Sequence, residues 1–169
     1  RQLFTRALTN HGERMLRDGR RASEVIDRIR SLSAKTERRK SPIDLHELIR
    51  ETLALIHYEV LRLRVHVKLE LGAGRSGLWG DRIQLQQVLL NLTMNGVEAM
   101  REVEDRRREL SIASSLSAPE VIAVRIRDSG VGLAPGAVEH LFEPFFTTKP
   151  DGIGLGLSIS QRIVVAHGG

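Results

Sequence analysis

The apolar positions of the chain change their spacing several times, and each change marks an expected element. Residues 3–32 carry apolar side chains at intervals of three and four, which predicts a long helix with one apolar stripe. Residues 44–59 repeat this spacing, and Asp44 and Glu47 are placed as a capping box at its start. Residues 64–71 alternate strictly between polar and apolar side chains, which is typical of a strand with one buried face.

The rest of the chain predicts a mixture of helices and strands. A short strand at 78–80 leads to Asp81, which is a good N-cap for an apolar helix ending near residue 100. Two strands, 109–114 and 121–128, are expected around a turn at 115–120. The last two expected elements are a short helix over 134–142 and a helix over 155–166 that stops at Gly168.

Composition limits the classes of protein that fit. The chain has 169 residues, of which 41% are hydrophobic but only 4% aromatic, so it can form one full-sized domain with an aliphatic core and a short appendage. The absence of cysteine excludes disulfides and thiolate metal sites and fits a reducing compartment. No stretch reaches the roughly 20 apolar residues that span a bilayer, and no signal peptide opens the chain. We therefore expect a soluble cytoplasmic piece without membrane contact, although the parent protein can be membrane-anchored.

The net charge of +5 is concentrated in two arginine-rich runs, 1–40 and 101–108. Such runs can bind nucleic acid. However, no aromatic side chains interleave with them, and the first run lies along the expected amphipathic helix, so we favour a solvated helix face. No nucleic-acid partner is expected.

The candidate chemistry lies in two glycine-rich segments and the residues between them. Asp128–Leu133 has the sequence DSGVGL, Gly152–Leu157 has the sequence GIGLGL, and 142–149 has the sequence FEPFFTTK. Glycine lets backbone N–H groups approach a polyanion closely. Because single glycine runs are also common in ordinary turns, it is the combination with a third segment that predicts phosphate binding.

The third segment is the apolar helix expected over 86–100. Asn91 and Asn95 are one turn apart in it and therefore share a face. Their neutral oxygens suit Mg²⁺, which keeps several waters and takes phosphate oxygens as its other ligands.

Taken in order, these segments resemble the ATP-binding domain shared by gyrase, the heat-shock chaperone, histidine kinases and the mismatch-repair ATPase MutL, and above all its histidine kinase branch. Residues 86–100 resemble the N box, 128–133 the first glycine box, 142–149 the F box and 152–157 the second glycine box. The last two boxes are similar to those of kinases that sense oxygen or dicarboxylates. The resemblance spans about half of the chain. It implies an α+β, Bergerat-type ATP-binding fold, which is a two-layer α/β sandwich with a mixed sheet covered by helices.

The resemblance also implies a role for each box. Asp128 would accept a hydrogen bond from the adenine amino group and so select adenine over guanine. Asn95 would be the principal Mg²⁺ ligand, and Asn91 would support metal or phosphate. Lys149 would approach the phosphates. The three phenylalanines of the F box, Phe142, Phe145 and Phe146, would anchor the lid over the site by burial. The residues expected at the ATP site are Asn91, Asn95, Asp128, Gly130, Gly132, Lys149, Gly152, Gly154, Leu155, Gly156 and Leu157.

Two residues of the N box bear on the type of reaction. Gyrase-like ATPases have glutamate at the position of Asn91, and an amide cannot act as a general base. The resemblance therefore favours a kinase that holds ATP for attack by a histidine over an ATP hydrolase. Glu98 occupies a position where other kinase branches often have lysine, so no phosphate contact is expected there.

The resemblance implies two domains. Residues 1–40 would form the second helix of a dimerisation and phospho-acceptor hairpin plus a linker, and 41–169 the catalytic domain. This implies a homodimer through a helical bundle and a response-regulator receiver domain as partner. His11 lacks the acidic residue and proline that follow an acceptor histidine, so the acceptor is expected outside this chain. The family domain continues with two further strands, which we expect to be missing here, leaving an unpaired sheet edge.

A degenerate kinase-like module that docks a partner or dimerises without phosphotransfer is the alternative function. Asn91, Asn95 and Asp128 are all intact, and so are the glycines of both boxes, which favours the catalytic interpretation.

Overall fold

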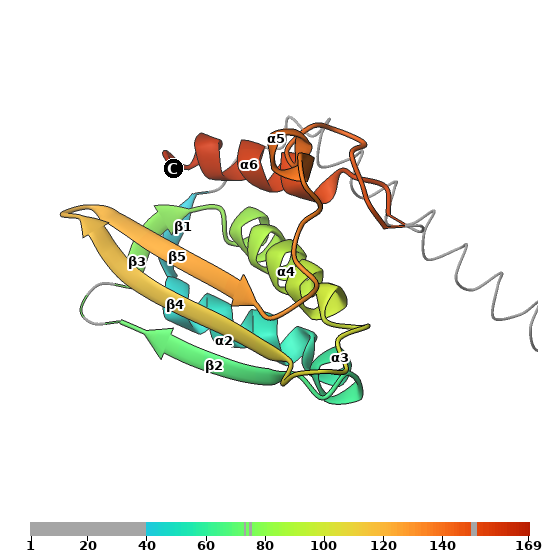
Figure 1. The fold of residues 1–169 in the computed structure, drawn as a ribbon. Coiled ribbons are helices and arrows are strands. Elements are labelled where there is room, and N and C mark those ends of the chain that lie inside the picture. Colours follow the sequence, from blue (N-terminus) through green and yellow to red (C-terminus); the bar gives the residue numbers. More distant parts are fainter. Residues whose placement is uncertain (1–39, 73, 75, 150–151) are drawn as a thin grey trace, which may run out of the picture. The chain divides into compact units, whose positions relative to one another are not determined.

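The computed structural model describes residues 40–72, 74, 76–149 and 152–169 (Figure 1). The chain divides into two units, Arg1–Glu37 and Arg38–Gly169. The long helix expected over 3–32 lies outside the described residues.

Three strands form a mixed sheet in the order β2–β4–β5. Strand β2 (His66–Leu71) runs parallel to β4 (Glu109–Ala118), and β4 runs antiparallel to β5 (Val121–Asp128). The mixed sheet is as the sequence predicts. Among the described residues β5 pairs with β4 alone. That two further strands are missing beyond it stays a prediction.

A second, smaller sheet joins β1 (Ser41–Asp44) to β3 (Gly77–Gly80) in antiparallel orientation. The sequence pattern places a linker and a break at Pro42 and does not predict β1. Among the described residues β1 pairs with β3 alone and is therefore an edge strand, where proline is tolerated because no second neighbour needs its N–H.

The described helices are α2 (Leu45–Leu55), α3 (His57–Arg62), α4 (Arg82–Ala99), α5 (Ala137–His140) and α6 (Gly156–Ala166). Figure 1 shows α2 and α4 covering one face of the main sheet, and α6 on the far side of α4. This is an α+β fold with a mixed sheet covered by helices. No helix in the described part of the chain combines the length and the apolar character needed to cross a membrane.

Helix α4 is buried on two sides. Leu89 and Val97 pack into the main core, which also contains Leu110 and Ile112 of β4. On another side of the helix, Val88 packs in a second cluster with three residues at the start of α6 and within it, Leu155, Ile159 and Ile163. Because two sides of the helix are apolar, its polar residues are confined to the remaining face.

Several boundaries differ from the sequence-based predictions. The helix expected over 44–59 is divided at Ile56 into α2 and α3. The hairpin turn is shorter than 115–120, because β4 continues to Ala118 and pairs it with Val121. The helix expected over 134–142 is reduced to α5, since Gly136 before it is left-handed at φ +79°.

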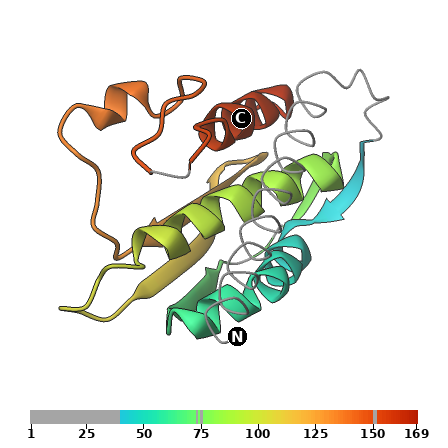
Figure 2. The same cartoon turned by 90° about the vertical axis from the view of Figure 1, so that its right-hand side faces the viewer.

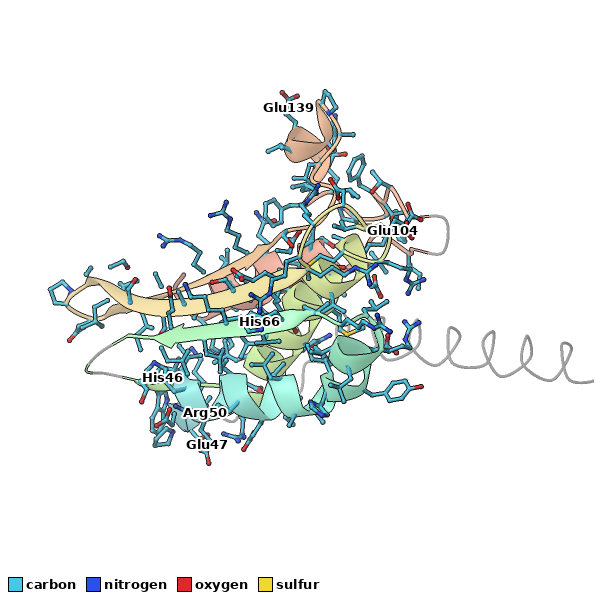
Figure 3. All side chains as sticks on the ribbon, turned by 60° about the horizontal axis from the view of Figure 1, so that its bottom comes forward. His46, Glu47, Arg50, His66, Glu104 and Glu139 are labelled. Atoms are coloured by element: carbon cyan, nitrogen blue, oxygen red, sulfur yellow. The ribbon has the colours of Figure 1, made fainter. Side chains whose placement is uncertain are left out.

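The N-terminus of α2 shows the expected cap and one unexpected contact. Asp44 accepts hydrogen bonds from the backbone N–H groups of Glu47 and His46, and the first of these bonds is the main cause that lowers the pKa of Asp44. The Glu47 carboxylate makes no return bond among the described residues. His46 is not the plain surface histidine that its position predicts, because its Nε2 lies 2.8 Å from Ser114 Oγ of β4. Glu47 and Arg50 instead lie on the side of α2 away from the sheet (Figure 3).

The start of α4 gives a test of the fold. Asp81 accepts hydrogen bonds from the N–H groups of Ile83 and Gln84 at 3.0 and 3.1 Å. Asp81→Ala should therefore lower the free energy of unfolding by about 1 kcal/mol, whereas Asp81→Asn, which keeps the accepting oxygen, should change it much less. Urea denaturation of the three proteins measures the difference. Equal losses in both variants would show that the cap does not stabilise α4.

Candidate functional site

The polar face of α4 carries the candidate site. Asn91, Asn95 and Glu98 follow one another at spacings of four and three residues, so their side chains share one face, and all three are half-buried. The chain between β5 and α6 loops away from the sheet (Figure 2). Three segments that are distant in the sequence contact α4 along its length: the start of α6, the turn that carries Lys149 and the end of β5.

The first contact joins Asn91 to the start of α6. The Asn91 Nδ2 donates a hydrogen bond of 2.9 Å to Ser160 Oγ, which fixes the direction of the carboxamide. Its Oδ1 is directed at Gly156, where a Cβ would overlap the carboxamide. Among the described residues no side chain caps α6, so N–H groups of its first turn lie next to Asn91 without a described capping partner.

The second contact joins Asn95 and Glu98 to Lys149. The Lys149 ammonium lies 2.9 Å from Asn95 Oδ1 and 2.6 Å from Glu98 Oε2. Glu98 was not expected to take part in the site. It is the partner of Lys149 and is separated from it by 51 residues in the sequence.

Backbone contacts between the F box and the second glycine-rich segment place Lys149 over α4. The N–H of Phe145 donates to the carbonyl of Gly154 at 2.9 Å, and Gly154 is left-handed at φ +71°. A Cβ on Gly154 would lie 2.5 Å from the Phe146 carbonyl, so only glycine permits this approach. The N–H of Lys149 donates to Thr147 Oγ1 at 3.1 Å, which orders the turn that carries the ammonium.

The third contact brings the end of β5 to the last turns of α4. Asp128 packs against Gly96, where a Cβ would lie 3.3 Å from that of Asp128. The Asp128 Oδ1 accepts a hydrogen bond of 2.9 Å from the N–H of Gly130. A Cβ on Gly130 would lie 2.7 Å from the carbonyl of Ala99, so the loop after Asp128 requires a residue without a side chain.

Two residues that the sequence interpretation did not select hold this loop. Arg106 donates to the carbonyls of Ser129 and Gly130 at 3.1 and 2.7 Å. Ser129 Oγ accepts from the N–H of Glu109 at 2.8 Å and donates to the carbonyl of Arg107 at 2.9 Å. The run 101–108 is therefore partly used to fix the loop after Asp128. A serine beside a glycine and an arginine in a charged run give no sequence signal for this role.

The remaining predicted site residues are placed differently. Gly132 is left-handed at φ +77°, but a Cβ on it would meet nothing within 4 Å. Leu155 is buried in the second core cluster, while Leu157 and Gly152 are half-buried. The expected burial of the three F-box phenylalanines is wrong for two of them, since Phe142 and Phe145 are 50% and 71% exposed. Phe146 is half-buried, with its ring centroid 5.6 Å from that of His140.

A separate hollow of about 480 Å³ lies on the opposite face of the main sheet. It is lined by Lys68, Glu70, Glu109, Ser111, Ala113, Arg125, Arg127, Asp128 and Ser129. Except for Asp128, which packs against Gly96 of α4, the strand residues among these alternate with those that face α4 and the core. The hollow shares Asp128 with the site on α4 but contains neither the carboxamides nor the second glycine segment, so it is distinct from that site.

The donor set on α4 fits a cation that brings other ligands with it. Within 40–72, 74, 76–149 and 152–169, no group of three or more His, Cys, Asp or Glu side chains is placed to hold a metal ion. Asn95 Oδ1, however, already accepts a cationic group, the Lys149 ammonium. Such a neutral oxygen suits Mg²⁺ when phosphate and water oxygens complete the coordination.

A helix with two carboxamides, a glycine-rich helix start and a strand-end aspartate defines a nucleotide-binding domain of the histidine kinase type. The family described as "Histidine kinase-, DNA gyrase B-, and HSP90-like ATPase" matches residues 80–169. The chain belongs to this family and contains its ATP-binding domain.

Similar proteins agree with this assignment. The sensor protein TdiS of Thauera aromatica is 38% identical over 149 residues, covering 88% of this chain and 27% of TdiS. The sensor protein FixL of Bradyrhizobium diazoefficiens is 40% identical over 149 residues, covering 88% of this chain and 29% of FixL. The solved catalytic domain of histidine kinase ThkA is 31% identical with a TM-score of 0.67, covering 76% of this chain and 81% of that domain. The chain thus spans less than a third of the length of TdiS or FixL.

Arg106 gives a test of how the loop after Asp128 is held. Arg106→Ala removes two hydrogen bonds to loop carbonyls, so amide hydrogen exchange at Gly130 and Val131 should accelerate and ADP affinity should fall by about fivefold. Arg107→Ala is the matched control, because the Arg107 side chain makes no hydrogen bond in the described part of the chain. Equal exchange at Gly130 in the two variants would contradict the role of Arg106.

Proposed function

We propose that this domain binds Mg-ATP and positions its γ-phosphate for transfer to a histidine outside this chain. One observation carries the proposal: three segments meet α4 in an order that matches the parts of a nucleotide. Asp128 lies at the C-terminal end of the helix, and Asn91 lies with Gly156 about two turns earlier, a rise of about 12 Å between Asn91 and Ala99. Asn95 and Lys149 lie between them.

The base binds at the Asp128 end in this proposal. Asp128 accepts one bond from the Gly130 N–H through Oδ1, and its second oxygen is left to accept from the adenine amino group. Guanine lacks a donor at that position and would leave the carboxylate unpaired, at a cost of roughly 1 to 3 kcal/mol. The glycines of this loop keep side chains out of the space next to the base.

The phosphates and Mg²⁺ bind at the other end. Asn95 is the principal metal ligand, with Asn91 as the supporting residue, and Lys149 contacts the phosphates. Gly152, Gly154 and Gly156 lead into α6, whose uncapped N–H groups and dipole favour phosphate oxygens. When bound, Mg²⁺ neutralises phosphate charge and helps to orient the γ-phosphate.

The side chains of the site favour phosphotransfer over hydrolysis. The side chain closest to a Cβ placed on Gly156 is that of Asn91, and an amide cannot remove a proton from water. The carboxylate of Glu98, on the same face, is engaged by Lys149 at 2.6 Å. The domain therefore holds ATP until an acceptor attacks it.

The assembly is also part of the proposal. Residues 1–40 form the second helix of a dimerisation hairpin plus a linker, 41–169 form the catalytic domain, and the protein works as a cytoplasmic homodimer that passes phosphate to a response regulator. Family membership supports this, as does a solved complex of histidine kinase ThkA with the response regulator TrrA. ThkA in that complex is 26% identical to this chain, with a TM-score of 0.67.

Calorimetric titration tests the nucleotide site. Mg-ATP should bind saturably and more tightly than Mg-GTP, and Asp128→Asn should weaken ATP binding by about tenfold or more. The amide keeps one accepting oxygen, which the Gly130 N–H occupies, so its NH₂ would face the adenine amino group and the hydrogen bond to the base would be lost. Asn95→Ala should remove the dependence of binding on Mg²⁺. Glu120→Gln, which changes the same charge at the hairpin turn, is the control and should leave both affinities unchanged.

Transfer is followed in the complete gene product with γ-labelled ATP. The label should appear on a histidine and disappear in Asn95→Ala. A folded sample that binds no ATP, or that binds ATP and GTP equally, would overturn the proposed site. Nucleotide binding without labelling would instead favour the docking-module alternative.

A further inference from the structure

The ammonium of Lys149 lies at the atom that the proposed function assigns to the metal. Asn95 Oδ1 accepts a hydrogen bond of 2.9 Å from Lys149 Nζ, and this oxygen is also the metal ligand of the proposal. An ammonium and Mg²⁺ on one amide oxygen would repel each other strongly, because like charges a few ångströms apart interact by several kcal/mol at the effective dielectric of a protein surface. Lys149 must therefore leave Asn95 before the metal can bind there.

Glu98 determines the position of the Lys149 ammonium before Lys149 leaves Asn95. Its Oε2 is 2.6 Å from the ammonium and supplies the negative charge of the contact, since Asn95 is neutral. Both side chains are partly open to solvent, at 41% for Lys149 and 36% for Glu98. A pair with this exposure is weak enough to exchange partners, unlike a fully buried pair, which would trap the lysine.

We propose that Glu98 is a positioning residue that holds Lys149 against Asn95 until nucleotide phosphates attract the lysine away, so that phosphate binding clears the metal ligand. This inference rests on the proposed function. The phosphates compete with Glu98 for the ammonium, and the departure of Lys149 exposes Asn95 Oδ1. The arrangement makes Mg²⁺ binding depend on nucleotide and keeps the metal ligand covered while the site is empty. It also gives a role to a glutamate at a position where other branches often have lysine.

A double-mutant cycle on Mg-free ATP binding tests the competition. Glu98→Gln should tighten ATP binding in EDTA by about two- to fivefold, because Lys149 no longer leaves a carboxylate. In the Lys149→Met background the same substitution should have no more effect than the control Glu102→Gln, an exposed glutamate just after α4. Adenosine, which has no phosphates, should bind Glu98→Gln and the unmodified protein equally.

The outcomes separate this inference from the proposed function. An equal gain from Glu98→Gln in both backgrounds would mean simple repulsion of phosphate by Glu98 and would overturn the positioning role. If Glu98→Gln gave no gain in ATP affinity in a protein that binds ATP, the positioning role would also be overturned. Failure of the unmodified protein to bind ATP would overturn the proposed function itself.

Binding of Mn²⁺ without nucleotide, followed by electron paramagnetic resonance, tests the covered ligand directly. Lys149→Met should bind Mn²⁺ at least about fivefold more tightly than the unmodified protein, and adding Asn95→Ala should cancel that gain. Equal affinities in the unmodified protein and Lys149→Met, including no binding by either, would show that Lys149 does not cover the metal ligand.

Discussion

The site depends on close packing of three backbone segments against one helix. Gly130 and Gly156 leave no room for a Cβ, which would overlap the Ala99 carbonyl and the Asn91 carboxamide respectively, and a Cβ on Gly96 would lie only 3.3 Å from that of Asp128. Burial of α4 on two sides, by the main core and by α6, prevents the helix from turning. Its remaining face therefore presents Asn91, Asn95 and Glu98 in a fixed direction. A Cβ at position 130 would push the loop after Asp128 away from α4, and one at position 156 would displace the Asn91 carboxamide, so the packing at both positions requires glycine.

The charged groups along this face of α4 are already in place before a ligand binds. The negative Asp128 lies at one end of the face, and the uncapped start of α6 lies at the other. Between them, Lys149 and Glu98 neutralise each other. A phosphate group can replace Glu98 as the partner of the lysine without leaving a buried charge alone, because the pair is partly hydrated. Positioning and electrostatic complementarity are the contributions that phosphoryl transfer needs from a protein.

The sequence was sufficient for the parts of the fold that are encoded locally. Asp81 and Asp44 mark helix starts, the alternation after residue 64 marks β2, and Asn91 and Asn95 share a face by helix periodicity alone. The sequence was insufficient where tertiary contacts determine the partners of a side chain or the bounds of an element. The Lys149–Glu98 pair and the hold of Arg106 on Ser129 join residues distant in sequence, and no local pattern signals them. Strand β1 was not predicted because a proline normally ends a strand. The length of α5 was overestimated because the left-handed Gly136 prevents the helix from extending toward its N-terminus. The family resemblance supplied the order of the boxes, but not the partners of their side chains.

The most direct measurement is a crystal structure of this domain with Mg²⁺ and a non-hydrolysable ATP analogue. We expect the adenine amino group within hydrogen-bond distance of the Asp128 carboxylate, Mg²⁺ on Asn95 Oδ1, and the Lys149 ammonium moved from Glu98 to a phosphate oxygen. A nucleotide bound elsewhere, for example in the hollow on the opposite face of the sheet, would contradict the proposed site. So would a complex in which Asp128 makes no contact with the base.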